Sequence, residues 1–242
     1  MILVALALLG FGVADLVRWS PDGKQPLRAL VAVLTGTVMV GTVASLSGMD
    51  SLGVVLSSVV SFATLGLWSA HGLLPSERSK PVFVLSLLMG VILVLVALSG
   101  SASGIGGDVA TWYSNLGFGF VHRVSVDQFV LGASAALFLL GTANRIVQLV
   151  LRAAGSSLLD GEGTLHGGRL LGPMERLIVA GAVVSGSVAA AGFVIAAKGL
   201  LRFREIGEAE TKVDEITEYF LIGTFTSIGL AATMAILVLA VA

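Results

Sequence analysis

Ionisable side chains inside or beside long apolar segments are the residues of this sequence that could do chemistry. A charged group within a lipid bilayer is costly, so it is a functional candidate by default. Asp15 lies near the end of an apolar run, and Arg18 follows three residues later on the same face of a helix. This spacing favours a local ion pair at the level of the lipid headgroups. The alternative is a proton or cation site built on Asp15.

A second group of charges flanks the last two apolar segments. Lys198 and Arg202 end one segment and Glu218 begins the next, so an antiparallel hairpin would bring the three to one membrane level. A carboxylate that faces two cations could fix the register of the helices, which is the favoured role, or help to bind an anion or a lipid headgroup. Glu175 and Arg176 belong to the opposite end of this hairpin and are expected to mark where its first segment begins.

Neither a metal site nor a catalytic constellation is predicted. His71, His122 and His166 fall in different segments, and the sequence contains no cysteine. Neither a nucleophile elbow nor a suitably placed pair of carboxylates is present. The sequence therefore predicts no catalytic residue, no bound metal and no cofactor, and it disfavours an enzyme.

All of these charged residues lie in or beside apolar segments, which are predicted to be membrane-spanning helices. With 56% hydrophobic and 12% charged residues, the composition is that of a membrane protein. A span needs about 20 mainly apolar residues, and by that measure the sequence predicts an all-α integral membrane protein, a bundle of about seven transmembrane helices. The predicted spans cover residues 1–17, 30–46, 52–74, 82–98, 129–146, 177–197 and 219–242.

A single membrane domain is expected over residues 1–242. It would consist of a five-span part over 1–152, a cytoplasmic loop over 153–173 and a two-helix hairpin over 174–242. The connector over 99–128 is rich in glycine and aromatic residues, which favours the outer membrane surface, with a re-entrant loop as the alternative.

The Lys and Arg residues of the connectors predict the orientation. With the N-terminus outside, nine of them lie on the inner side and five on the outer side. Most of the outer five come from the last connector, so the C-terminal hairpin fits the positive-inside rule poorly. The five are Arg123, Lys198, Arg202, Arg204 and Lys212.

Small residues recur at every fourth position in both C-terminal segments. Such stripes let neighbouring backbones approach closely where lipid supplies no hydrophobic drive for packing. The predicted packing positions are Ala182, Gly186 and Ala190 in the first segment and Gly223, Ser227, Ala231 and Ala235 in the second.

The C-terminal third resembles a family of bacterial polytopic membrane proteins that is defined only as a domain of unknown function. The resemblance lies in the stretches GGRLLGPMERLIV, GFVIAAKGLLRFREI and EYFLIGTFTSIGLA. In the N-terminal half only Ala14 and Asp15 match, and Phe11 stands where the family has a histidine. The resemblance implies a bacterial inner-membrane setting without implying an activity.

Together these observations favour a non-enzymatic membrane component or complex subunit, which associates with copies of itself or with a membrane partner through its small-residue faces. The alternative is a small transporter or channel that uses Asp15 or the Lys198, Arg202 and Glu218 cluster, and a membrane-embedded enzyme ranks third. The expected partners are the lipid bilayer and another membrane protein. Nucleic acid is not expected, because the net charge is −1 and the basic residues are dispersed.

Overall fold

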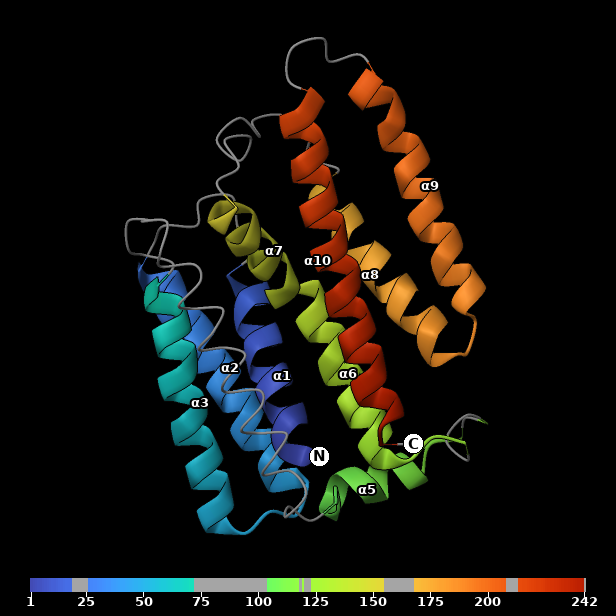
Figure 1. Cartoon of the computed structure of the whole chain (residues 1–242). Helices are drawn as coiled ribbons and strands as arrows, with labels where there is room; N and C mark the ends of the chain where they lie inside the picture. Colours follow the sequence, from blue (N-terminus) through green and yellow to red (C-terminus); the bar gives the residue numbers. More distant parts are fainter. Residues whose placement is uncertain are drawn as a thin grey trace. The chain divides into compact units, whose positions relative to one another are not determined.

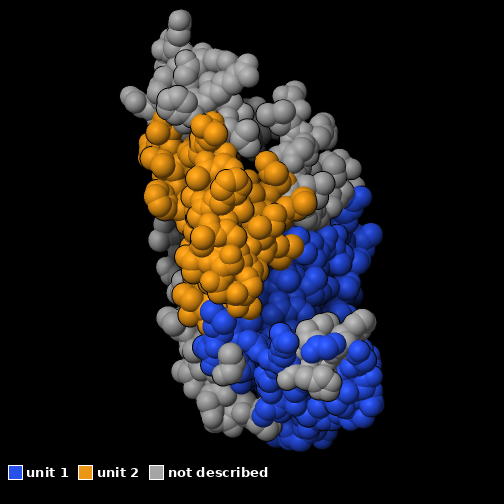
Figure 2. All heavy atoms as spheres, turned by 90° about the vertical axis from the view of Figure 1, so that its right-hand side faces the viewer, with its two compact units in different colours: residues 1–75, 86–142, 238–242 blue, residues 76–85, 143–237 orange. Residues whose placement is uncertain are grey.

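The structure, a computed structural model, describes residues 1–18, 26–71, 104–117, 119, 123–154, 168–207 and 213–241. All regular structure within these ranges is α-helical, so the prediction of an all-α protein is confirmed for the described part (Figure 1). The chain divides into two compact units, shown in Figure 2. Unit 1 comprises residues 1–75, 86–142 and 238–242, and unit 2 comprises residues 76–85 and 143–237.

Helix α1 lies at the centre of unit 1. It covers Ile2–Val17 and packs against α2 (Pro26–Leu46), α3 (Ser51–His71) and α6 (Val126–Leu140). A short helix, α5 (Gly107–Ser114), lies within the connector over 99–128 and contacts α2 and α6. Most of α1 is buried, which explains why a helix of 16 residues is apolar almost throughout.

Glycines allow α1 to come very close to its neighbours. A Cβ atom added to Gly12 would lie 2.6 Å from the carbonyl carbon of Leu137 on α6, and one added to Gly36 on α2 would lie 2.8 Å from the carbonyl oxygen of Gly10. Real side chains cannot be accommodated at these separations. The closest helix packing in unit 1 therefore depends on glycine, as is common among membrane helices.

Three helices of the described part are long and apolar enough to cross a membrane: α2, α3 over Ser51–Ala70 and α10 over Thr217–Leu239. A fourth span results if α6 and α7 (Thr142–Ala153), which break at Gly141, are taken together. Large apolar side chains on α2 and α3 point outward, and Val38 and Val59 are 64% and 60% exposed. These helices support a multi-pass membrane protein in contact with a lipid bilayer.

The prediction of about seven spans is not confirmed. The first predicted span forms α1, which is apolar but only 16 residues long, and the fifth is broken at Gly141. The predicted span over 82–98 lies outside the described residues.

Unit 2 is built from α7, α8 (Gly168–Val184), α9 (Val188–Gly207) and α10 (Val213–Leu239), apart from Thr142 and the last two residues of α10. The predicted two-helix hairpin over 174–242 is thus wrong, because three helices occupy this part of the chain. The predicted loop over 153–173 is also too long, since α8 already begins at Gly168 and has Pro173 buried inside it. Residues 155–167 lie outside the described part.

The predicted span over 177–197 is wrong because the chain turns back at Gly186. This residue has a φ of 77°, a left-handed conformation that glycine adopts without strain. The Ser187 N–H donates to the Ala182 carbonyl and the Gly186 N–H donates to the Val183 carbonyl, at 2.8 and 3.0 Å. These two bonds form a Schellman motif, which ends α8 by satisfying its last carbonyl groups.

The turn also divides the three residues of the first predicted packing stripe between different elements. Ala182 lies on α8, Gly186 in the turn and Ala190 on α9, so the three do not share one helix face. The second stripe is on one helix, α10, but its Ser227, Ala231 and Ala235 are buried inside the chain. Ala231 packs with Val179 and Ala191 of the α8–α9 hairpin. Ser227 and Ala231 therefore pack against other helices of unit 2, and the buried part of the stripe is not a free surface.

Candidate functional site

The carboxylate of Asp15 is buried in unit 1 and is bound by a tryptophan. Asp15 is 6% exposed, and the indole Nε1–H of Trp68 on α3 donates to its Oδ2 at 3.0 Å. Phe11, one turn earlier on α1, meets the Trp68 ring edge-on with 5.8 Å between the centroids. The i, i+4 spacing of Phe11 and Asp15 places both on the face of α1 that meets α3.

Arg18 also reaches α3. Its NH1 donates to the backbone carbonyl of Ser69 at 3.2 Å, near the end of α3 at His71. The last carbonyls of a helix have no partner within the helix and carry partial negative charge, so a guanidinium is favourable there. Asp15 and Arg18 thus lie on one side of α1, as their spacing predicts, and both contact the C-terminal part of α3.

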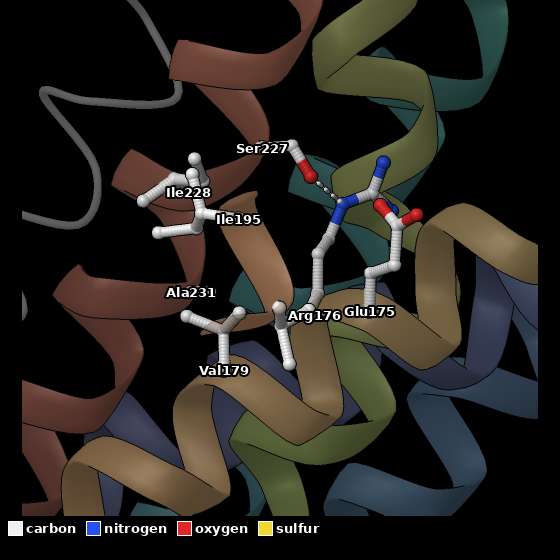
Figure 3. Close-up of a pocket in the computed structure, with 8 residues that line it drawn as sticks. Glu175, Arg176, Val179, Ile195, Ser227, Ile228 and Ala231 are labelled. Carbon is white, nitrogen blue, oxygen red and sulfur yellow. Dashed lines mark hydrogen bonds between the residues drawn. The ribbon is translucent and has the colours of Figure 1, made fainter. Parts of the chain in front are cut away.

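The second candidate site surrounds Arg176 in unit 2. Arg176 is 4% exposed, its Nε–H donates to Ser227 Oγ on α10 at 3.0 Å, and its NH2 donates to Asn144 Oδ1 on α7 at 3.3 Å. Figure 3 shows the guanidinium joined to Ser227, with the Glu175 side chain beside it. One arginine of α8 therefore links α7, α8 and α10.

An arginine guanidinium is protonated at neutral pH, so the centre of unit 2 holds a cation. The Glu175 carboxylate lies beside it in the sequence and in the pocket.

The sequence predicts that Arg176 marks the start of a span, and the structure adds that its side chain is buried between helices. Ser227 and Asn144 offer oxygen acceptors that compensate in part for the loss of water around the guanidinium.

A small pocket lies beside Arg176 between α8, α9 and α10 (Figure 3). Glu175, Arg176 and Ser227 supply its polar groups, and its apolar lining includes Val179, Val194 and Ala231. The space for the centre of a water molecule is about 10 Å³, which is on the order of what a single water needs. The pocket could hold a water next to the guanidinium, but it is too small for an organic solute.

Asn144 belongs to this site although the sequence analysis did not select it. A signal was present, because Asn144 is an amide inside the predicted apolar span over 129–146. Polar side chains in membrane helices commonly bond to a neighbouring helix. Its partner, 32 residues further on, could not be identified from the spacing.

The predicted cluster of Lys198, Arg202 and Glu218 is only partly described. Glu218 is exposed near the start of α10, whereas the side chains of Lys198 and Arg202 lie outside the described part. Within the described residues, no group of three or more His, Asp or Glu side chains could hold a metal ion.

Comparison of the chain with protein-family models, with curated proteins and with solved structures gives no match. The resemblance of the C-terminal third to a bacterial membrane-protein family therefore remains an expectation.

Proposed function

We propose that this protein is a non-enzymatic, multi-pass component of a bacterial inner membrane, in which buried charged side chains fasten helices together. The observation that carries the proposal is the hydrogen bonding of Arg176, which joins three helices beside a pocket of water size. A guanidinium that is hydrogen-bonded to two other helices stabilises the packing of those helices.

Asp15 supports the same interpretation in unit 1. Its carboxylate accepts the Trp68 N–H, so α1 and α3 are joined by a buried hydrogen bond. Buried polar networks whose members are bonded make packing specific, since any other register would leave them without partners. In both units the charged group is bonded between helices.

The component would act by association with a copy of itself or with another membrane protein. The α10 stripe is not proposed as the contact surface, because Ser227, Ala231 and Ala235 are covered within the chain. The outward apolar side chains of α2 and α3 are proposed to contact lipid, since both helices are long enough to cross a bilayer.

The proposal is tested by reconstituting the protein into liposomes that carry separate dyes for protons, chloride and potassium. A structural component leaves the leak of each ion equal to that of liposomes without protein. Native mass spectrometry of the same preparation should show a stable oligomer or a co-purified membrane protein. A flux that rises in proportion to the amount of protein contradicts the proposal.

The second candidate function is a small transporter or channel. Its support is that Asp15 and Arg176 are both buried and that Asp15 lies in an apolar helix. Ionisable residues buried among membrane helices often lie on ion pathways. This function predicts a flux that Asp15→Asn or Arg176→Gln abolishes and that Arg152→Gln, at an exposed site on α7, leaves intact.

A further inference from the structure

The hairpin of α8 and α9 reverses the direction of the chain inside a segment that is apolar enough to have been predicted as one crossing. Figure 1 shows α8 running toward the turn at Gly186 and α9 running back from it. The two helices pack against each other, and Val179 and Ala191 form one apolar cluster with Ala231 of α10. The hairpin is therefore a packed unit.

Neither arm of the hairpin is long enough to cross a bilayer by itself. The uncharged part of α8 after Arg176 covers residues 177–184, and the apolar part of α9 is Val188–Ala197, which ends before Lys198. At about 1.5 Å per residue these arms extend about 12 and 15 Å, against about 30 Å for the hydrocarbon core. If α8 and α9 each crossed the bilayer completely, the charged residues before residue 177 and after residue 197 would have to enter the lipid.

The outer face of the hairpin fits lipid acyl chains. Ile178 on α8 is 53% exposed, and Val188 and Phe193 on α9 are 68% and 76% exposed. Ser185, Gly186 and Ser187 at the turn are exposed as well. The hairpin surface is apolar near the turn and ends in charged residues on both arms. This pattern fits a hairpin whose turn lies in the hydrocarbon core and whose two ends lie at one headgroup layer.

The distribution of basic residues provides an independent argument. With the other predicted crossings kept, over 1–17, 30–46, 52–74, 82–98, 129–146 and 219–242, a single crossing at this place leaves nine Lys and Arg residues on one side of the membrane and five on the other. If the hairpin returns to the side from which it enters, Lys198, Arg202, Arg204 and Lys212 join the larger group. Thirteen of the 14 basic residues then lie on one side, and only Arg123 lies on the other. The positive-inside rule strongly favours this arrangement.

We infer that α8 and α9 form a re-entrant hairpin, which enters the bilayer, contacts acyl chains with its outer face, turns at Gly186 before the far headgroups and leaves on the side of entry. Residues 143–154 and the connector between α9 and α10 are then on the same side of the membrane. This topology does not depend on whether the protein transports a solute, so a flux measurement and a topology measurement can fail separately.

The native sequence contains no cysteine, so single-cysteine variants report on one site each. Glu210→Cys probes the connector after α9, and the matched control Ala154→Cys probes the exposed residue after α7. In sealed membrane vesicles of known orientation, a membrane-impermeant maleimide should label both cysteines from the same side. Asn115→Cys, in the connector over 99–128, should label from the opposite side. Labelling of Glu210→Cys from the side of Asn115→Cys, or from neither side, overturns the inference.

Ser187→Cys distinguishes a re-entrant turn from two complete crossings. The impermeant reagent should label it from neither side of intact vesicles, and should label it once detergent has dissolved the bilayer, because maleimide reacts with the thiolate, which forms in water. Labelling by the impermeant reagent from the Asn115 side shows two crossings, and labelling from the Ala154 side shows a hairpin outside the bilayer. Either result overturns the inference.

Discussion

Trp68 on α3 donates its indole N–H to the buried carboxylate of Asp15 on α1, with 3.0 Å between Nε1 and Oδ2. The two residues are 53 positions apart, and their bond joins the central helix of unit 1 to a candidate membrane span. A charged acceptor roughly doubles the strength of a hydrogen bond, and a buried site makes its loss costly.

Replacement of Trp68 by Phe should destabilise unit 1. The substitution keeps an aromatic ring against Phe11 but removes the donor to Asp15, which should lower the free energy of unfolding by about 1–3 kcal/mol. Thermal unfolding in detergent, followed by circular dichroism, measures the effect. Trp112→Phe is the matched control, because Trp112 is 54% exposed and should tolerate the change. Equal stability of the two variants would contradict the role given to the bond.

Gly12→Ala should disrupt the packing of α1 against α6. The new methyl group would lie 2.6 Å from the Leu137 carbonyl carbon, so the two helices must separate. Overpacking of this kind costs about 1–3 kcal/mol or more. Gly66→Ala on α3 is the control, since its Cβ would meet nothing within 4 Å. Fluorescence-detected size exclusion should show a loss of folded protein for the first variant alone.

Ser227→Ala and Asn144→Ala should each weaken unit 2, because each removes one acceptor from the Arg176 guanidinium. Hydrogen bonds to charged groups contribute about 1.5–3 kcal/mol in water-soluble proteins, and membrane values tend to be smaller. A double-mutant cycle with Arg176→Gln measures the coupling for each pair. Additive effects within about 0.3–0.5 kcal/mol would show that the pairs do not interact.

Gly186→Ala should destabilise the α8–α9 turn, because a side chain at a φ of 77° is strained. The expected cost is about 1–2 kcal/mol. Gly186→Asn should cost less, since asparagine tolerates the left-handed region better than alanine does. Gly192→Ala, within α9 and with open space around its Cβ, is the control and should be neutral or stabilising. Unfolding in detergent that ranks Ala below Asn at position 186 would agree with the turn.

The presence of helices and their apolar surroundings could be predicted because both depend on local sequence. The predicted segment over 30–46 corresponds to α2, and the one over 52–74 largely corresponds to α3. The pattern of charges could not reveal how Arg176 is bonded, because a charge at the edge of an apolar segment gives no sign of its partners. Those partners, Asn144 and Ser227, lie 32 and 51 positions away.

The sequence by itself predicted an all-α chain with helices apolar enough for a membrane, and it selected Asp15 as a costly group in an apolar segment and Arg176 as a residue at the start of one. Only the tertiary structure decided that the chain turns back at Gly186 and that both charged groups are bonded between helices. The reason is physical. Helix formation depends on neighbouring residues, whereas the end of a helix and the partner of a buried charge depend on which distant surfaces can pack together.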